Sequence, residues 1–511
     1  MRNHKWRRCG RYVAAALGIA AFTVCLPAVR AKAAVTSDWS EPVLLDKGDL
    51  NGDGRYTVRD ALRALQINAG LYEADEQTKE RADVNADGLV SADDALLLLK
   101  AAVGEYSNFG YEKPQEERVI YVDSKSYTTG THCFRTLGEA VDYVNQHAPP
   151  CDEERITLRF APGTYREHTT LTAPYVTYEA MYPDAEEEAN LTFYYGCGMY
   201  YWSISDGNVS ASSNHASTVI ASTAHDFIAK NMMFENSYNI YVTEEEREDY
   251  RKYARGEDGN WYGNALTIEQ REKDIRSSKN QTQGLALRVD ADRSAFYECK
   301  MIGRQDTLLM NQSNRVYYEN CYIEGTVDFI YGNGTAVFES CTINSPYNAG
   351  HITAASTAET QPYGFLFKDC MLTCDPTTES SAPKEESYSL GRPWNGPAMV
   401  VFYNCRMDKH ISNKDTPNFD RFVQMGGNGF LPENARYAEY GTMDMEGNLI
   451  DLEVVAPSYE KLLTDQEIQT SYAPYAFLAA KYNPSTRQLD EPDGWNPGNY
   501  PVVPLVLPGE E

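Results

Sequence analysis

A short stretch of this 511-residue chain occurs twice at a fixed offset. Residues Cys299 to Asp306 read C-K-M-I-G-R-Q-D, and residues Cys321 to Asp328 read C-Y-I-E-G-T-V-D. Cysteine, glycine and aspartate recur at the same places, 22 residues apart. A constant offset of this size is typical of a solenoid, in which each repeat forms one coil of the chain.

The phrase aromatic-x-x-Cys continues this pattern along the chain. Short β-rich runs that place small apolar residues at one recurring position predict a parallel β-helix, although coincidence among aromatic-rich strands is an alternative. The copies are Phe296–Cys299, Tyr318–Cys321, Phe338–Cys341, Phe367–Cys370 and Phe402–Cys405, together with Phe234–Ser237, in which serine replaces cysteine.

Stacked coils would bring Asp306 and Asp328 together. Neighbouring parallel strands lie roughly 4.8 Å apart, so equivalent positions in adjacent coils would place two carboxylates on one face. Two such groups do not both ionise freely, and one of them retains a proton. We therefore expect one nucleophile or base and one acid. A pair of solvated turn aspartates is the alternative.

Residues 1–33 are typical of a secretory signal peptide. Basic residues precede the apolar run Val13–Pro27, and Ala31 to Ala33 offers a small-x-small cleavage site. An uncleaved membrane anchor is the alternative, but the run is short for a bilayer-spanning helix. Because no later segment is long and apolar enough to span a membrane, we expect a secreted, extracellular protein without a membrane span in the mature chain.

Charge and cysteine content exclude other classes of protein. The formal net charge of -28 argues against nucleic acid as a partner, because the phosphate backbone would be repelled. Most cysteines outside the signal peptide occupy the recurring interior position, where cysteine behaves as a small apolar residue. A disulfide between Cys370 and Cys374, or between Cys133 and Cys151, is left open.

Two twelve-residue stretches near the N-terminal end have the pattern of calcium-binding loops. Each has Asp, Asn and Asp at positions 1, 3 and 5, followed by glycine and then by a residue that offers its carbonyl. Each ends in Asp, where an EF-hand usually has Glu, and runs into a helical segment. Acidic turns are the alternative. The predicted metal positions are Asp49, Asn51, Asp53, Arg55, Thr57 and Asp60 in the first loop and Asp83, Asn85, Asp87, Leu89, Ser91 and Asp94 in the second.

This duplicated loop–helix unit resembles a dockerin module over residues 44–106. The resemblance implies a small all-α module that holds two structural calcium ions and binds a cohesin module of a scaffold protein, at the cell surface or in a cellulosome. Loop positions ten and eleven, which govern partner choice in that family, are Val58-Arg59 and Ala92-Asp93. A calcium-stabilised spacer without a cohesin partner is the alternative. Residues 107–117 are interpreted as a linker.

Residues 118–511 are expected to form a large, mainly β domain. Strands at Val119–Asp123 and Arg155–Phe160 flank the segment Thr136–Val144, which has helical spacing. The polar stretch Tyr241–Lys279 is interpreted as an excursion from the coils, and such insertions often build a binding groove.

Several motifs of this domain look like the successive motifs of pectin methylesterases (pectinesterases), in order and in approximate spacing. The resemblance covers about residues 118–480 and implies a right-handed parallel β-helix that hydrolyses methyl esters of galacturonate in pectin, without a cofactor for catalysis. The motifs are FRTLGEAV from Phe134, RITLRFAPGTYRE from Arg155, QGLALR from Gln283, GRQDTL from Gly303, GTVDFIYG from Gly325 and LGRPW from Leu390.

The resemblance implies a catalytic role for two aspartates and two glutamines. Asp328 would be the nucleophile that attacks the C6 ester carbonyl and forms an acyl-enzyme. Asp306 would be the general acid that protonates methanol, and then the base for the hydrolytic water. Gln283 and Gln305 would donate hydrogen bonds to the developing oxyanion.

The resemblance also implies how the nucleophile and the sugar are held. Arg392 would orient Asp328 and keep it ionised. Trp394 would lie against a sugar ring, and Tyr331, where phenylalanine is common in the family, would contact the polysaccharide. Each residue has a structural alternative: Gln283 could cap a turn, Arg392 could form a surface ion pair, and the aromatic residues could be core packing.

Two other functions are compatible with the same residues. A retaining glycosidase needs two carboxyl groups about 5 Å apart, and β-helix proteins also cleave pectin backbones. Gln283 and Gln305 together with Arg392 distinguish the esterase, because an ester hydrolase needs oxyanion donors and a glycosidase does not. The second rival is a non-catalytic β-helix that binds pectin and is displayed through its dockerin.

Overall fold

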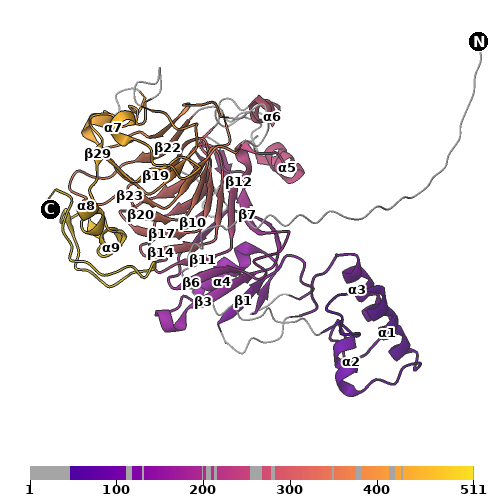
Figure 1. Cartoon of the computed structure of the whole chain (residues 1–511). Helices are drawn as coiled ribbons and strands as arrows, with labels where there is room; N and C mark the ends of the chain where they lie inside the picture. Colours follow the sequence, from indigo (N-terminus) through magenta and orange to yellow (C-terminus); the bar gives the residue numbers. More distant parts are fainter. Residues whose placement is uncertain are drawn as a thin grey trace, which may run out of the picture. The chain divides into compact units, whose positions relative to one another are not determined.

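Three parallel sheets make up the large domain of the computed structural model. From β3 to β27, apart from the separate pair β8 and β9, the chain visits each sheet in turn, so that strands that follow one another in sequence lie in different sheets. All pairings within these sheets are parallel, as between β14 and β17 or between β16 and β19. The domain is therefore the predicted parallel β-helix, and its stacked strands are visible in Figure 1.

The strands of the three sheets have the following bounds. The 12-stranded sheet contains β2 (Cys133–Phe134), β1 (Val119–Val122), β3 (Ile156–Phe160), β6 (Val176–Ala180), β11 (Ile228–Lys230), β14 (Ser294–Tyr297), β17 (Arg315–Glu319), β20 (Thr335–Glu339), β23 (Phe365–Lys368), β26 (Met399–Tyr403), β28 (Arg436–Tyr440) and β29 (Lys461–Leu462). The 8-stranded sheet contains β27 (Arg406–Met407), β24 (Met371–Thr373), β21 (Thr342–Asn344), β18 (Tyr322–Glu324), β15 (Lys300–Ile302), β12 (Met233–Asn236), β7 (Ala189–Phe193) and β4 (Gly163–Arg166). The 7-stranded sheet contains β25 (Tyr388–Gly391), β22 (Gly350–Ala355), β19 (Val327–Gly332), β16 (Leu308–Met310), β13 (Leu285–Val289), β10 (Ala216–Ile220) and β5 (Thr169–Leu171).

The remaining elements are helices and two short antiparallel pairs. The pairs are β8 (Tyr200–Trp202) with β9 (Val209–Ala211), and β30 (Tyr482–Asn483) with β31 (Gln488–Leu489). The helices are α1 (Val58–Asn68), α2 (Glu76–Ala82), α3 (Ala92–Ala102), α4 (Leu137–Gln146), α5 (Glu244–Tyr253), α6 (Ile268–Ser277), α7 (Leu452–Val455), α8 (Asp465–Gln469) and α9 (Pro474–Leu478), with short 3₁₀ turns at Asp152–Glu154, Ser237–Asn239 and Pro432–Asn434.

The structure describes most of the chain beyond the N-terminal segment. The described residues are 47–110, 118–128, 132–197, 200–202, 209–211, 216–253, 268–277, 282–347, 350–375, 383–413, 420–426 and 430–509. The predicted signal peptide, residues 1–33, and residues 111–117 of the predicted linker lie outside them. In the described part, no helix is long and apolar enough to cross a membrane.

Aromatic rings stack along the interior of the β-helix, where the repeated phrase placed them. Phe296, Tyr318, Phe338, Phe367 and Phe402 face one another in adjacent strands of the 12-stranded sheet. Consecutive ring centroids are 4.9, 4.7, 4.5 and 4.9 Å apart, and the rings are nearly parallel. The five cysteines that follow them are buried beside this row, and all nine described cysteines are free thiols.

Each of these cysteines follows a sharp corner between two sheets. The residue before it has a left-handed backbone, with φ between 53° and 55°. One predicted copy of the phrase is wrong: Phe234 lies in β12 and pairs with Met301, not with Phe296. The partner of Phe296 in that coil is Ala229, because the corner there is formed by Asn231, whose φ is 55°. The row of aromatic rings therefore begins at Phe296. The corner residues are Glu298, Asn320, Ser340, Asp369 and Asn404.

Different elements cover the first coils and the 12-stranded sheet. At the N-terminal end, α4 buries Leu137, Val141 and Val144 in the main core, as its helical spacing predicted. At the other end of the chain, residues 489–507 pack against the 12-stranded sheet. Arg315, only 1% exposed, donates to both carboxylate oxygens of Asp493 at 2.9 and 2.6 Å. This long-range contact fixes the C-terminal segment on the sheet.

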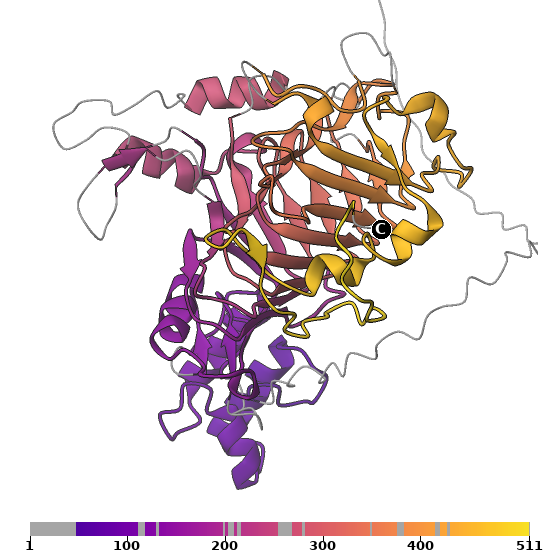
Figure 2. The same cartoon turned by 90° about the vertical axis from the view of Figure 1, so that its left-hand side faces the viewer.

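The polar stretch 241–279 leaves the coils, as predicted. Its described parts are α5 and α6, which belong to none of the sheets and project beside the strands in Figure 2. Arg271 of α6 forms a buried ion pair with Glu246 of α5, and its guanidinium lies 3.8 Å from the centre of the Tyr238 ring. The excursion is therefore anchored at its base.

Candidate active site

Asp306 and Asp328 stand at equivalent places in two adjacent coils. Leu308 of β16 pairs with Ile330 of β19, and each aspartate precedes its paired residue by two positions. Both aspartates have a left-handed backbone, with φ of 60° for Asp306 and 54° for Asp328. The 22-residue offset thus brings the two carboxylates close enough for the charge of one to act on the other.

Arg392 reaches Asp328 from the strand on the far side of β22. Its backbone N–H donates to the Thr353 carbonyl at 3.0 Å, which continues the pairing of β25 with β22. The guanidinium Nε donates to Asp328 Oδ1 at 2.7 Å, and Nη2 donates to Oδ2 at 2.6 Å. The Arg392 and Asp328 side chains are 17% and 12% exposed, so this is a largely buried, bidentate pair rather than a surface ion pair.

The two carboxyl groups have different electrostatic surroundings. Burial, and next the charge of Asp328, raise the pKa of Asp306 to about 8. The Gln305 side chain donates to Asp306, and together with the charge of Arg392 it limits this rise in pKa. Burial also raises the pKa of Asp328, but the two hydrogen bonds and the charge of Arg392 oppose that rise. At neutral pH Asp306 is therefore protonated, whereas the Asp328 carboxylate is paired with the Arg392 guanidinium.

Gln283 and Gln305 lie on neighbouring coils next to the aspartates. Gly284 N donates to the Gln305 carbonyl at 3.1 Å, which joins the two segments side by side. The Gln283 carbonyl accepts from the backbone N–H of Cys197 at 2.8 Å. The backbone of each glutamine is thus fixed, and both residues are partly exposed.

Trp394 and Tyr331 form an aromatic corner at the same site. Their ring centroids are 5.6 Å apart and the rings are inclined at 68°. Trp394 is 44% exposed, which is incompatible with core packing, whereas Tyr331 is 3% exposed. A half-exposed indole beside a pair of carboxyl groups offers an apolar face to a ligand.

The two predicted calcium loops share one hydrogen-bond pattern. In the first, Asp49 Oδ2 accepts from the backbone of Gly54 at 2.8 Å; in the second, Asp83 Oδ2 accepts from Gly88 at 2.9 Å. Both glycines have positive φ, 76° and 85°, as a sharp turn at position 6 requires. The duplicated sequence pattern thus corresponds to a duplicated loop structure.

The last carboxylate of each loop is turned inward. Asp60 and Asp94 are fully buried, and both oxygens of each accept from N–H groups of their own loop. Within the described residues, no three His, Cys, Asp or Glu side chains converge as metal ligands. The donors at positions 1, 3 and 5 are carboxylate and amide oxygens, which are the kinds of ligand that Ca²⁺ prefers. The donor set therefore fits calcium by its chemistry.

Comparison with known families agrees with both halves of this description. Residues 272–481 match the family model described as Pectinesterase. The chain contains a pectinesterase-family domain. Residues 47–101 match the model of the dockerin type I domain. All predicted catalytic and substrate-binding residues fall inside the first match, and all predicted loop ligands fall inside the second.

Individual relatives extend the comparison to most of the β-helix. Pectinesterase 31 of Arabidopsis thaliana is 38% identical over 159 residues, which is 31% of this chain and 45% of that protein. A pectinesterase of Petunia integrifolia is 25% identical over 345 residues, covering 66% of this chain and 75% of the relative. The solved structure of pectin methylesterase PemA from Erwinia chrysanthemi covers 71% of this chain and 97% of its own, with a TM-score of 0.51 at 24% identity, and supports the fold.

The β-helix brings two further residues near the aspartates. The Cys197 thiol is close enough to Asp306 for the aspartate's charge to add to burial in raising the thiol pKa. Burial, and next the charge of Arg392, lower the pKa of His351 to about 3, so this imidazole is neutral. Neither residue could have been found from the sequence. His351 pairs with Val327 and Ser389 at offsets of 24 and 38 residues, which differ from the 22-residue repeat, and Cys197 belongs to no repeat.

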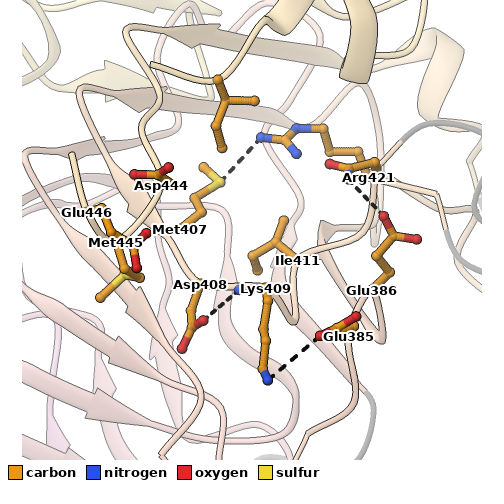
Figure 3. A pocket seen from close by; sticks show the side chains of 12 residues that line it. Glu385, Glu386, Met407, Asp408, Lys409, Ile411, Arg421, Asp444, Met445 and Glu446 are labelled. Carbon is orange, nitrogen blue, oxygen red and sulfur yellow. Dashed lines mark hydrogen bonds and ion pairs between the residues drawn. The ribbon is translucent and has the colours of Figure 1, made fainter. Parts of the chain in front are cut away.

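A separate cavity of the pectinesterase domain, of about 630 Å³, contains none of the predicted catalytic residues. Figure 3 shows Glu385, Asp408 and Asp444 around it, with Lys409 paired to Glu385. Because carboxylates dominate its lining, a polyanionic chain such as pectate would be repelled there. The cavity is lined by Glu385, Glu386, Met407, Asp408, Lys409, Ile411, Asn413, Arg421, Asp444, Met445, Glu446 and Ile450.

Proposed function

We propose that this protein hydrolyses the methyl esters of galacturonate residues in pectin, releasing methanol and de-esterified pectate. The observation that carries the proposal is the bidentate pair of Arg392 with Asp328 in the coil next to Asp306, inside the segment that matches the pectinesterase family. Burial raises the pKa of Asp306 to about 8, which suits a general acid. An acid and a nucleophile in adjacent coils are what ester hydrolysis through an acyl-enzyme requires.

In the first step Asp328 attacks the C6 ester carbonyl. One carboxylate oxygen forms a bond to the carbonyl carbon, and the carbonyl oxygen becomes an oxyanion that the side chains of Gln283 and Gln305 stabilise. The methoxy group then leaves with the proton of Asp306, as methanol. Galacturonate remains bound to Asp328 as a mixed anhydride, and Asp306 is now an anion.

In the second step water replaces the enzyme at the acyl carbon. The Asp306 carboxylate takes a proton from the water, and the resulting hydroxide equivalent attacks the anhydride carbonyl. The acyl bond to Asp328 breaks, which regenerates the Asp328 carboxylate beside Arg392 and the protonated Asp306. The side chains return to their starting states, and one water has been consumed for each methanol released.

The N-terminal module is proposed to attach the enzyme to a scaffold outside the cell. The match to the dockerin type I model supports a cohesin module as its partner. Two structural calcium ions would be held by the six predicted positions in each loop, and their charge would neutralise the loop carboxylates. Removal of calcium with a chelator should abolish binding of a cohesin module in a native gel while methanol release by the full chain persists.

The test of the catalytic proposal is methanol release from highly methyl-esterified pectin, with reducing ends measured in the same samples. Asp328→Asn keeps a side chain that tolerates left-handed φ but removes the nucleophile, and should lower methanol release at least about a thousandfold. Asp369→Asn is the matched control, because Asp369 also has φ of 54° but is 41% exposed at a corner of the coil. It should leave the rate unchanged.

Other outcomes would contradict this function. New reducing ends without methanol would show that the protein is a glycosidase that cleaves the pectin backbone and that the two aspartates serve that reaction. Pectin binding without either product, by folded protein, would identify a non-catalytic binding module. Equal methanol release by wild type and Asp328→Asn would remove Asp328 from the role of nucleophile.

A further inference from the structure

A buried ion pair joins the two coils that carry Asp306 and Asp328. Arg304 lies two residues before Asp306, and Glu324 lies four residues before Asp328. The Arg304 guanidinium donates through Nη1 to Glu324 Oε1 at 2.6 Å. The two side chains are 3% and 10% exposed, so the pair lies inside the domain rather than on its surface. It therefore connects the same two coils as the carboxyl groups of the proposed active site.

The turn that leads to Asp306 is attached to the neighbouring coil through Arg304. The Arg304 carbonyl accepts from the backbone N–H of Thr326 at 2.9 Å, and the N–H of Gly303 donates to the Glu324 carbonyl at 3.2 Å. Nη1 of Arg304 also donates to the Gly303 carbonyl at 2.7 Å, so the side chain folds back over its own turn. Because Asp306 follows only two residues later, a shift of this turn would displace its carboxyl group.

Both charged groups of the pair are held by further contacts. Glu324 Oε2 accepts from the Tyr322 hydroxyl at 2.7 Å and from Asn344 Nδ2 at 3.0 Å. The Arg304 guanidinium lies 5.0 Å from the centre of the Tyr347 ring, which is itself buried. A buried network in which the carboxylate has several donors is rigid. The ion pair therefore has one defined geometry.

The repeat of the β-helix does not require this ion pair. The residue that pairs with Glu324 in the neighbouring coil is Ile302, and the residue 22 positions after Arg304 is Thr326, so neither charge recurs between these coils. Replacing a buried ion pair by apolar side chains of similar volume often leaves stability unchanged or raises it, so the fold alone does not account for the pair. A fixed geometry is what the pair adds, and it adds it between the coils of the two aspartates.

We propose that Arg304 and Glu324 are positioning residues, which hold the turn that carries Asp306 against the neighbouring coil. This inference rests on the proposed function, in which Gln305 stabilises the oxyanion and Asp306 gives its proton to methanol. Both tasks depend on placement, because a displacement of about 1 Å at a reacting group can lower the rate about a hundredfold. Arg304 and Glu324 act through this turn and not by contact with the substrate.

The test compares two variants that each remove the charge of a buried carboxylate. Glu324→Gln should lower kcat for methanol release from highly methyl-esterified pectin about 10- to 100-fold, with KM within about threefold of wild type. Asp292→Asn is the matched control, because Asp292 pairs with Arg315 and these side chains are 11% and 2% exposed. Arg315 belongs to the 12-stranded sheet, so kcat of the control should stay within about twofold. Both variants should unfold at lower denaturant concentrations than wild type.

A double variant separates the effect on rate from the effect on stability. Arg304→Met combined with Glu324→Gln leaves no unpaired buried charge, so most of the stability lost in Glu324→Gln should return. The ion pair between the coils is still missing, so kcat should stay at least about tenfold below wild type. Wild-type kcat in folded Glu324→Gln or in the double variant would overturn the inference. So would an equal loss of kcat in Asp292→Asn, which would show a general effect of a broken ion pair.

The titration of Asp306 provides a readout that does not depend on turnover. Burial, the charges of Asp328 and Arg392, and a hydrogen bond from Gln305 set its pKa. In a loosened turn the carboxyl group is better hydrated, so its pKa should fall by about one unit. The double variant should show the same fall, which excludes the unpaired charge of Arg304 as its cause. Infrared titration of the carboxyl group, with Asp306→Asn as the blank, measures this pKa.

This titration also separates the inference from the proposed function. If wild type releases no methanol, the proposed function has failed, and the pKa of Asp306 then decides the inference. A lower pKa in both Glu324→Gln and the double variant, but not in Asp292→Asn, would support the positioning role. An unchanged pKa in the double variant would overturn it.

Discussion

The same succession of parallel coils builds two rows of side chains with opposite energetics. In the interior of the β-helix it stacks aromatic rings 4.5 to 4.9 Å apart, all fully buried. On the 7-stranded sheet it brings Asp306 and Asp328 together in the same way. Stacking apolar rings stabilises the fold, whereas stacking carboxyl groups raises the free energy of the ionised pair. In a solenoid, side chains at equivalent positions of neighbouring coils are therefore stacked whether or not their contact is favourable.

The row of carboxyl groups is short, and the carboxylate at one end of it has a cationic partner. The position equivalent to Asp306 in the preceding coil is Leu285, which is 1% exposed. At the other end the register of β19 and β22 shifts between Val327 and Ile330, and Arg392 takes both oxygens of Asp328. The carboxylate pair is therefore flanked by an apolar residue and a bulge, while the aromatic row continues over five coils.

Removing a ring from the stabilising row should have the largest effect on stability. Phe338→Ala empties a fully buried place between Tyr318 and Phe367 and should lower the free energy of unfolding by about 3–5 kcal/mol. At 25 °C, kcat per folded molecule should stay within about twofold, because the ring lies in a different sheet from the site. Denaturant unfolding and methanol release measure the two quantities. Lost activity with unchanged stability would contradict the separation of the two rows.

Removing the cationic partner of Asp328 should mainly lower the catalytic rate. Arg392→Ala leaves Asp328 without its bidentate partner, so the nucleophile is misplaced and its pKa rises further. We expect kcat/KM to fall at least about a hundredfold at pH 7, with part of the loss recovered at higher pH. Arg392→Lys keeps the positive charge but loses the bidentate geometry, so its kcat/KM should lie between those of wild type and the alanine variant. Equal rates for the alanine variant and wild type would show that the pair is structural only.

The raised pKa of Asp306 predicts that both the rate and the stability decrease as pH rises, but over different pH ranges. The rate of methanol release should fall up to about tenfold per pH unit above pH 8, as the general acid is lost. Unfolded Asp306 releases its proton near pH 3.8, but the folded group keeps it to about pH 8, so the free energy of unfolding should decrease as pH rises through this window. Asp306→Asn should remove that part of the slope in denaturant titrations at pH 5, 7 and 9. An identical slope in both proteins would contradict the pKa.

The sequence predicted the contacts that follow from the repeat and missed the contacts that do not. The 22-residue offset was sufficient to pair Asp306 with Asp328, because parallel register carries an offset directly into space. The phrase at Phe234 was misleading, since an aromatic residue three positions before a small one occurs in a strand as readily as at a corner. The pair Arg315–Asp493 spans 178 residues and repeats nowhere, so only the folded chain reveals it.

A substitution at the corner residue before an interior cysteine should have the smallest effect on stability among these predictions. Asn320 has φ of 54°, the same value as Asp328. Alanine in this conformation brings its Cβ against the following carbonyl, so Asn320→Ala should destabilise the protein by about 1 kcal/mol, whereas Asn320→Gly should change stability by less. Chemical denaturation of both variants measures the difference. Equal stability would mean that the left-handed corner stores no strain, and the same backbone at Asp328 would then carry none.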